Sequence, residues 1–322
     1  MSRIVVHVSR IVVHRLRLGL GVFCAILAWM TIPDYRPVDP PSAQGQPRHE
    51  DTVAIHFHCF HLEYVPRFLR AVENFRDADI FVSVVSELAL NEFQRAWDAS
   101  SLQNQLTLRI ARNAGRNFGP LFVEFGAELR GYNLVVHVHS KNRNGRAFRR
   151  RWADFLWRWT IEDPAHVDKV RGLFSRDSTL GIYFALSPFS VPVDFGWFGS
   201  DSAAESLLPT YVRSEQGRPP FAYPAGGMLW FRPSALEPLF RVAANPELYE
   251  EEPLANPARK DGSTTEYAIE RLVAVVPSHD GWKALTFLRP NGRFVIEDRF
   301  MSPLIWVYGF PFRKTRTSRL PI

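Results

Sequence analysis

The fold is decided by four short apolar runs, Val53-Ala-Ile-His-Phe-His58, Ile80-Phe-Val-Ser-Val-Val85, Leu106-Thr-Leu-Arg-Ile110 and Asn133-Leu-Val-Val-His-Val138. Each run is rich in β-branched residues and has the length of a strand. Between them, apolar residues recur at helical spacing in three segments, Val65 to Phe75, Leu88 to Trp97 and Leu121 to Leu129. Strands that alternate with helices predict an α/β domain whose mostly parallel sheet is flanked by helices.

The composition of the 322 residues indicates a globular protein with a substantial core. Hydrophobic residues make up 46% and charged residues 22%, which excludes wholesale disorder and rod-like folds. Only two cysteines occur, Cys24 and Cys59, so a disulfide scaffold and a cysteine-rich zinc module are excluded as well.

The net charge of +6 comes mostly from arginine, because only five of the 39 basic residues are lysines. Two explanations stay open for this bias. One is the codon composition of the source genome. The other is a phosphate-rich ligand or an anionic membrane surface, since arginine binds phosphate in a bidentate manner.

The chain divides into four segments. Residues 1–32 are basic and then apolar, residues 33–50 form a proline-rich linker, residues 51–285 form the main domain, and residues 286–322 form an aromatic and basic tail. The apolar run from Leu18 to Ile32 has 15 residues, fewer than the roughly 20 that cross a bilayer. A short membrane anchor, an interfacial helix and an unstructured extension are all open interpretations of the first segment.

Ligands of parallel α/β sheets bind at the carboxyl ends of strands, and polar clusters follow three of the predicted strands. The first cluster contains His56, His58, Cys59 and His61. A metal site, structural histidines and a nucleotide-contacting loop are open interpretations of it. The second cluster is Asn113-Ala-Gly-Arg-Asn-Phe-Gly-Pro120, which is either an anion or ribose site or an ordinary strand-to-helix turn.

The third cluster is His137-Val-His-Ser-Lys-Asn142, which ends the fourth predicted strand. Burying such groups without partners costs on the order of several kcal/mol, so they either reach solvent or serve a site. Five arginines between Arg143 and Arg151 follow this cluster and raise the local positive potential. A solvated face is the favoured explanation of that basic run.

Taken together, five blocks of the chain resemble the rhamnan synthesis F family of polysaccharide-assembly glycosyltransferases. The blocks are Val53 to Leu69, Asn113 to Pro120, Tyr132 to Lys141, Tyr223-Pro-Ala-Gly-Gly-Met-Leu-Trp-Phe-Arg-Pro233 and Asp261-Gly-Ser-Thr-Thr-Glu-Tyr-Ala-Ile-Glu-Arg-Leu272. The resemblance runs from about Val53 to about Val276 and so covers most of the main domain.

The resemblance implies a GT-A-like fold and a nucleotide-sugar donor. In ordinary GT-A enzymes an Asp-x-Asp motif at the end of the corresponding strand holds a divalent metal against the donor diphosphate. Here His137, His139 and Lys141 stand in that place. We expect Lys141, helped by His139, to replace the metal by neutralising the leaving diphosphate. No cofactor is therefore expected, and a divalent metal is the less favoured alternative.

Asp77-Ala-Asp79 has the letters of the metal motif, but it precedes a strand instead of ending one. We interpret it as a surface loop.

A transferase that inverts the anomeric centre also needs a base for the acceptor hydroxyl. By its place in the resemblance Asp261 is the first candidate, followed by Glu266. Glu270 lies four residues beyond Glu266 on a predicted helix, so that it either contacts substrate or forms a structural charge pair with Arg271. The family commonly has a histidine where Tyr267 stands.

Catalytic roles are thus predicted for Asp261, Glu266, Lys141 and His139. Substrate binding is predicted for His58, His61, Asn113, Gly115, Arg116, Asn117, Gly119, His137, Gly226, Gly227, Trp230, Arg232 and Glu270. A position in the core is an equal alternative for Trp230. No residue is assigned as a metal ligand.

The leading prediction is a hexosyltransferase that moves a sugar, with rhamnose as one candidate, from a nucleotide diphosphate sugar to a surface polysaccharide or lipid-linked glycan. The main alternative is a non-catalytic nucleotide- or glycan-binding module of the same fold. A metal-dependent hydrolase built on His56, His58 and His61 is a third class.

The expected partners are the donor, the glycan acceptor and a membrane surface, and no nucleic acid is expected. Nucleotide sugars are cytoplasmic in bacteria, which favours membrane association at the cytoplasmic face. A type II membrane protein with a lumenal or periplasmic domain is the alternative.

Overall fold

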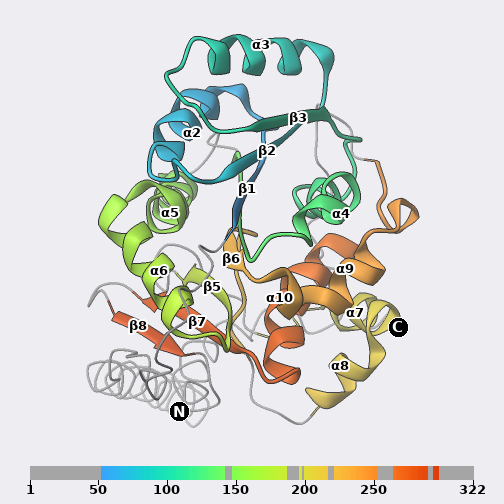
Figure 1. Ribbon diagram of the computed structural model, residues 1–322. Coiled ribbons are helices and arrows are strands. Elements are labelled where there is room, and N and C mark those ends of the chain that lie inside the picture. The colour runs from blue at the N-terminus through green and yellow to red at the C-terminus, as the bar shows by residue number, and fades with distance from the viewer. Residues whose placement is uncertain are drawn as a thin grey trace, which may run out of the picture.

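The computed structural model describes residues 52–141, 147–186, 196–197, 199–216, 221–251, 264–288 and 293–296. Within these residues the strands form one eight-stranded sheet in the order β3-β2-β1-β4-β6-β5-β7-β8 (Figure 1). The strands are β1 (Val53–His58), β2 (Asp79–Val84), β3 (Leu106–Ile110), β4 (Leu134–His139), β5 (Leu180–Leu186), β6 (Leu229–Phe231), β7 (Lys283–Leu288) and β8 (Arg293–Ile296). The α-helices are α2 (Val65–Val72), α3 (Glu87–Asp98), α4 (Gly126–Leu129), α5 (Ala147–Trp157), α6 (Pro164–Arg176), α7 (Asp201–Leu207), α8 (Pro209–Ser214), α9 (Glu237–Ala243) and α10 (Thr265–His279).

The central strands are buried on both faces, which agrees with their nearly continuous apolar sequences. On one face, Phe57 of β1 packs against Phe68 of α2 and Trp157 of α5. On the other face, Phe231 of β6 packs against Phe240 of α9. Helices α2, α5 and α6 thus cover one face, and α4, α9 and α10 cover the other (Figure 1). The predicted α/β fold with a mostly parallel, helix-flanked sheet is confirmed.

One antiparallel strand in the middle of the sheet determines where the loops meet. β1 is parallel to β2 and β4, β2 to β3, and β5 to β7, whereas β6 runs antiparallel to both β4 and β5. Leu229 at the start of β6 therefore pairs with His137 near the end of β4. Residues 223–228, which lead into β6, are brought to the edge at which the parallel strands end.

The predicted helix from Leu121 to Leu129 is interrupted. A π-helical turn spans Pro120–Glu124, and α4 begins at Gly126. Phe125 between them has φ −123° and ψ 0°, and its ring packs against His56 and Phe81. Burial of this ring against the sheet accounts for the break.

The predicted anchor (residues 1–32), the predicted linker (residues 33–50) and most of the predicted tail lie outside the described residues. The anchor and the linker therefore stay predictions. The described part of the tail, residues 286–288 and 293–296, belongs to β7 and β8, so the sheet extends past the predicted boundary at residue 285. Within the part of the chain that the structure describes, no helix combines the length and the hydropathy needed to cross a membrane.

Candidate functional site

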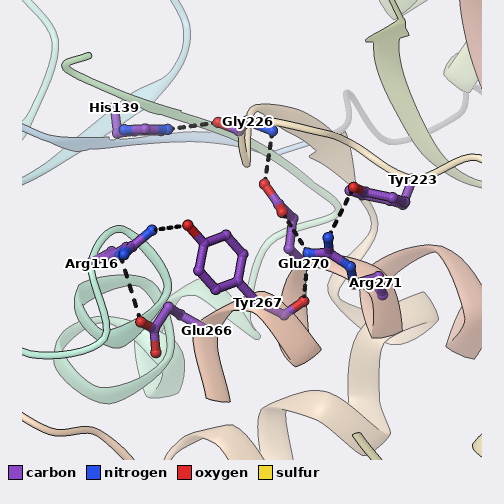
Figure 2. A network of polar contacts seen from close by, with 8 residues as sticks. All are labelled: Arg116, His139, Tyr223, Gly226, Glu266, Tyr267, Glu270 and Arg271. Atoms are coloured by element: carbon purple, nitrogen blue, oxygen red, sulfur yellow. Dashed lines mark hydrogen bonds and ion pairs between the residues drawn. The ribbon is translucent and has the colours of Figure 1, made fainter. Parts of the chain in front are cut away.

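Several elements meet at the carboxyl edge of the parallel strands. β1 and β4 end there side by side, with His58 paired to His139. The segment of residues 113–119 follows β3, residues 223–228 precede β6, and α10 contributes its first turns (Figure 2). These elements carry most of the residues predicted from the sequence as site residues.

A glycine turn at Gly226 and Gly227 lies at the centre of this edge. The carbonyl oxygen of Gly226 accepts a hydrogen bond from Nε2 of His139 at 2.7 Å, and its N–H donates to Oε1 of Glu270 at 2.7 Å (Figure 2). The φ angles of Gly226 and Gly227 are +98° and +70°, which side chains rarely allow. A β-carbon at Gly227 would also lie 2.5 Å from Nδ2 of Asn117. Both positions therefore require glycine.

Lys141 follows β4 and places its ammonium group beside this turn. A β-carbon added to Gly226 would lie 3.0 Å from Nζ of Lys141, and Nζ lies 4.5 Å from the centre of the Trp152 ring. Among the described residues, no hydrogen-bond acceptor or carboxylate pairs directly with this ammonium. Burial lowers the pKa of Lys141 to about 8, a shift that Glu270 opposes and Arg116 reinforces. The group is a largely buried cation that titrates near neutral pH.

Arg116 brings a second cation to the edge. Its backbone has a φ of +52°, in the left-handed region. Nη1 donates to the hydroxyl of Tyr267 at 2.8 Å, and the guanidinium stacks 4.6 Å from the centre of the same ring. Nε lies 3.6 Å from Oε1 of Glu266, whose side chain is 12% exposed (Figure 2). A carboxylate with limited access to solvent thus lies next to a cation.

Glu270 holds the glycine turn onto α10. While Oε1 accepts from Gly226, Oε2 accepts from Nη1 of Arg271 at 2.9 Å (Figure 2). Arg271 is buried, and it also donates to the backbone oxygen of Tyr267 at 2.9 Å and to the hydroxyl of Tyr223 at 3.0 Å. The structural charge pair between Glu270 and Arg271 is confirmed. Glu270 thus orients the turn, and each of its carboxylate oxygens already accepts one hydrogen bond.

His58 and His137 lie beneath the site. Both are buried, and burial lowers the pKa of His58 to about 4 and that of His137 to about 3. His61 is half-buried just after β1, and burial lowers its pKa against the opposing effect of Glu63. The two buried imidazoles are neutral at pH 7 and support the loops above them.

Two predicted binding residues lie elsewhere. Trp230 is fully buried, donates from Nε1 to the Thr160 oxygen at 2.7 Å and packs against Phe75, so its alternative position in the core is the observed one. Arg232 follows β6 and donates to the backbone oxygens of Phe174 at 2.7 Å and Leu180 at 3.1 Å. Because β6 is antiparallel, Arg232 lies at the opposite edge of the sheet. Neither position supports the predicted role in binding.

The remaining predicted residues fall into three groups. Gly115 and Gly119 are packed against the chain itself, since a β-carbon would lie 2.3 Å from the Tyr249 ring or 2.0 Å from the Ala114 oxygen, respectively. Asn113 is half-buried between β3 and these glycines. Asp261 lies outside the described residues, so its predicted role as base stays a prediction.

The contacts of four site residues were not predicted from the sequence. Arg271 and Tyr223 support the turn, Tyr267 stacks on Arg116, and Trp152 faces Lys141. The first three lie inside the blocks of resemblance, which was the available signal. Trp152 lies in the basic run after β4, where nothing distinguishes it from the aromatic residues around it.

A family comparison agrees with this geometry. Residues 38–281 match the family described as rhamnan synthesis protein F, which covers most of the chain. The chain belongs to the rhamnan synthesis protein F family. The resemblance stated from the five blocks is therefore confirmed, and membership indicates a glycosyltransferase-type role in rhamnan synthesis. Comparison with curated proteins gives no match.

The residues at the end of β4 in this rhamnan synthesis protein F member do not fit a divalent metal. Nε2 of His139 is engaged with Gly226, its Nδ1 lies 3.0 Å from the Ser140 oxygen, and the Lys141 ammonium would repel a cation. No group of three or more His, Cys, Asp or Glu side chains in the described residues is arranged to hold a metal. Asp77 and Asp79 lie at the other edge, where Asp79 starts β2.

Proposed function

We propose that the protein is a glycosyltransferase that moves a sugar from a nucleotide diphosphate sugar to a surface polysaccharide or a lipid-linked glycan. The observation that carries this proposal is the Lys141 ammonium, largely buried at the carboxyl end of β4, with no anionic group bonded to it among the described residues. A preorganised cation of this kind stabilises charge that develops in a transition state. Family membership supports the same class of reaction, and rhamnose is the candidate sugar.

In the proposed reaction, Lys141 and Arg116 contact the donor diphosphate, and the glycine turn packs beside the Lys141 ammonium. The acceptor hydroxyl transfers its proton to a carboxylate, and its oxygen forms a bond to the anomeric carbon. The bond between that carbon and the diphosphate oxygen breaks, and the diphosphate takes the electron pair. Lys141 neutralises the charge that results.

Glu266 is the candidate base among the described residues, because its carboxylate lies at the site, whereas both oxygens of Glu270 already accept from Gly226 and Arg271. Asp261 remains the alternative from the sequence. A base placed on α10 would take the proton on the acceptor side of the site.

A non-catalytic nucleotide- or glycan-binding module is the second candidate function. The observation that favours it is the ion pair of Glu266 with Arg116, which already engages this carboxylate with a cation. A binding module would retain affinity for a nucleotide diphosphate and turn over no donor.

We also propose that the protein attaches to a membrane surface, because a lipid-linked glycan acceptor lies in a membrane. Arg149, Arg150 and Arg151 of α5 are exposed, and such a basic cluster is attracted to anionic lipid. Co-sedimentation with phosphatidylglycerol vesicles at low salt checks this, and equal recovery with neutral vesicles would contradict it.

The experiment that tests the proposed function follows donor consumption over a panel of nucleotide sugars, with EDTA present. One donor is expected to turn over in the wild type, and Glu266→Gln is expected to bind that donor without turning it over. Binding without turnover in the wild type would select the non-catalytic module. No binding of any donor would contradict both functions.

A further inference from the structure

A chain of buried polar side chains runs beneath the proposed site. Nε2 of His137 lies 3.0 Å from Nδ2 of Asn117, and Nδ1 of His137 lies 2.9 Å from Nδ1 of His56. Nε2 of His56 lies 3.4 Å from the hydroxyl of Ser83, which lies 2.9 Å from Nδ1 of His58. All five residues are buried, so each link depends on its neighbours and not on water.

The direction of these hydrogen bonds follows from the Asn117 end. Nδ2 of Asn117 lies 3.0 Å from Nε2 of His137 and 3.4 Å from the carbonyl oxygen of Gly227. A carbonyl can only accept, so an amide nitrogen must face Gly227, and Nε2 of His137 must accept from the same amide.

Each further link is then determined in turn. His137 carries its proton on Nδ1 and donates to Nδ1 of His56. His56 carries its proton on Nε2 and donates to Ser83. We assign the Ser83 hydroxyl as the donor to Nδ1 of His58, because among the described residues it lies beside no other acceptor side chain. The four links require neutral imidazoles, each in a single tautomer.

The surroundings favour these neutral forms. Burial lowers the pKa values of His56, His58 and His137, and Lys141 adds a repulsive positive charge near His137. The His139 ring stacks on that of His137, while Phe118 packs against His137 and Phe125 against His56. An extra proton on His137 or His56 would also set two donors against each other at a link.

We propose that this histidine chain positions the glycine turn of the site: it fixes the Asn117 amide in one orientation, and Asn117 in turn holds Gly227. The contact is close, since a β-carbon at Gly227 would lie 2.5 Å from Nδ2 of Asn117. The consequence for donor binding rests on the proposed function. His56, Ser83 and His137 act through Asn117 and are positioning residues.

The direct test is the tautomeric state of the histidines in the wild-type protein, read from long-range ¹⁵N–¹H correlation spectra at pH 7. The expected result is a proton on Nδ1 of His137 and on Nε2 of His56 and His58. The opposite tautomers, or a mixture, would overturn the proposal. This measurement needs no ligand, so it stands apart from the proposed function.

Two variants test the consequence for the turn. His137→Leu removes the acceptor for Asn117 and is expected to shift the Gly227 amide resonance and to weaken binding of UDP or dTDP at least tenfold. Ser83→Ala breaks the chain farther away and should reproduce the effect more weakly. His166→Leu is the matched control, because His166 is also buried but bonds Tyr183 away from the site.

Different outcomes test the positioning role and the proposed function. An unchanged Gly227 resonance in a folded His137→Leu variant, or equal effects of His137→Leu and His166→Leu, would overturn the positioning role. Failure of the wild type to bind either nucleotide would contradict the proposed function while leaving the tautomer and resonance tests in force.

Discussion

At the amino edge of the sheet, charged side chains satisfy one another, whereas the carboxyl edge holds a cation without such a partner. Lys283 starts β7 and donates to Asp177 at 2.7 Å, and Asp77 pairs with Arg171 in the same region. At the carboxyl edge Lys141 has no acceptor of this kind among the described residues. Its pKa is lowered to about 8 by burial.

The charge pairs at the amino edge stabilise the fold, whereas the Lys141 ammonium at the carboxyl edge is the group that we propose to bind an anionic ligand. Exposed ion pairs contribute about 0–1 kcal/mol to stability and leave little charge unsatisfied. A cation held in a largely dry position costs free energy in the unliganded protein, which is a reason to look for an anion that offsets the cost. Substitutions at the two edges, and at the groups around them, test this contrast.

The largest effect is expected at Lys141. Lys141→Ala removes the proposed counter-charge of the leaving diphosphate, so donor turnover should fall by about 100-fold or more. Lys283→Ala is the control, because Lys283 is 43% exposed and belongs to a pair at the amino edge. Steady-state turnover of both variants checks this. Equal losses of turnover in the two variants would contradict the proposed difference between the two edges.

The second effect is on stability against pH. The folded pKa of His58 lies at about 4, below the unfolded value of 6.5, so the unfolded chain binds more protons between these values. The contribution of His58 to the free energy of unfolding is therefore fully present above about pH 6.5. It is lost as pH falls towards 4, by about 3 kcal/mol. Urea unfolding at pH 4.5 and 7 measures it, and His58→Gln should show a smaller loss. An identical loss in the variant would contradict the neutral, buried imidazole.

The third comparison sets Gly227 at the carboxyl edge against Gly281 at the amino edge. Both have positive φ, +70° and +86°, so alanine strains either backbone by about 1 kcal/mol. A β-carbon at Gly227 also meets Asn117, whereas none of the surrounding atoms lies within 4 Å of one at Gly281. Gly227→Ala should therefore lower the free energy of unfolding by about 1–2 kcal/mol more than Gly281→Ala, by analogy with overpacked sites. Similar unfolding midpoints would argue against close contact with Asn117.

The smallest effect is expected for Asp77→Asn. The pair with Arg171 is 56% exposed on the Asp77 side, so its removal should cost less than about 1 kcal/mol. Turnover should be unchanged, since Asp77 lies at the opposite edge from the site. A loss of donor turnover in Asp77→Asn would contradict this expectation and would indicate that Asp77-Ala-Asp79 is a functional motif.

Much of the fold could be predicted from the sequence because β1, β2 and β4 are buried on both faces and therefore appear in the sequence as nearly continuous apolar runs. The order of helices between these strands followed from spacing alone. The break at Phe125 could not be predicted, since it depends on a ring that packs under β1 and β2.

The site was predictable to the extent that it follows strand ends. Lys141 and Arg116 gather as expected because parallel strands end at one edge, whereas Glu266, predicted from the family resemblance, reaches the same edge from the first turn of α10. Arg232 was misplaced because the direction of a strand of only three residues could not be predicted from the sequence, and for Trp230 the alternative position in the core is the observed one. Antiparallel pairing places the residue after β6 at the far edge, and Trp230 lies in the core because β6 is buried on both faces.

The central claim, that Lys141 takes the place of a metal, is tested most directly by titration calorimetry of UDP and dTDP at pH 8 with EDTA. With a pKa of about 8, Lys141 is half protonated there, and a bound diphosphate should complete its protonation. Measurements in two buffers of different ionisation enthalpy should therefore give an uptake of about half a proton per ligand. The uptake should vanish in Lys141→Arg and persist in Lys283→Arg. Binding that disappears in EDTA, or proton uptake that Lys141→Arg leaves unchanged, would contradict the claim.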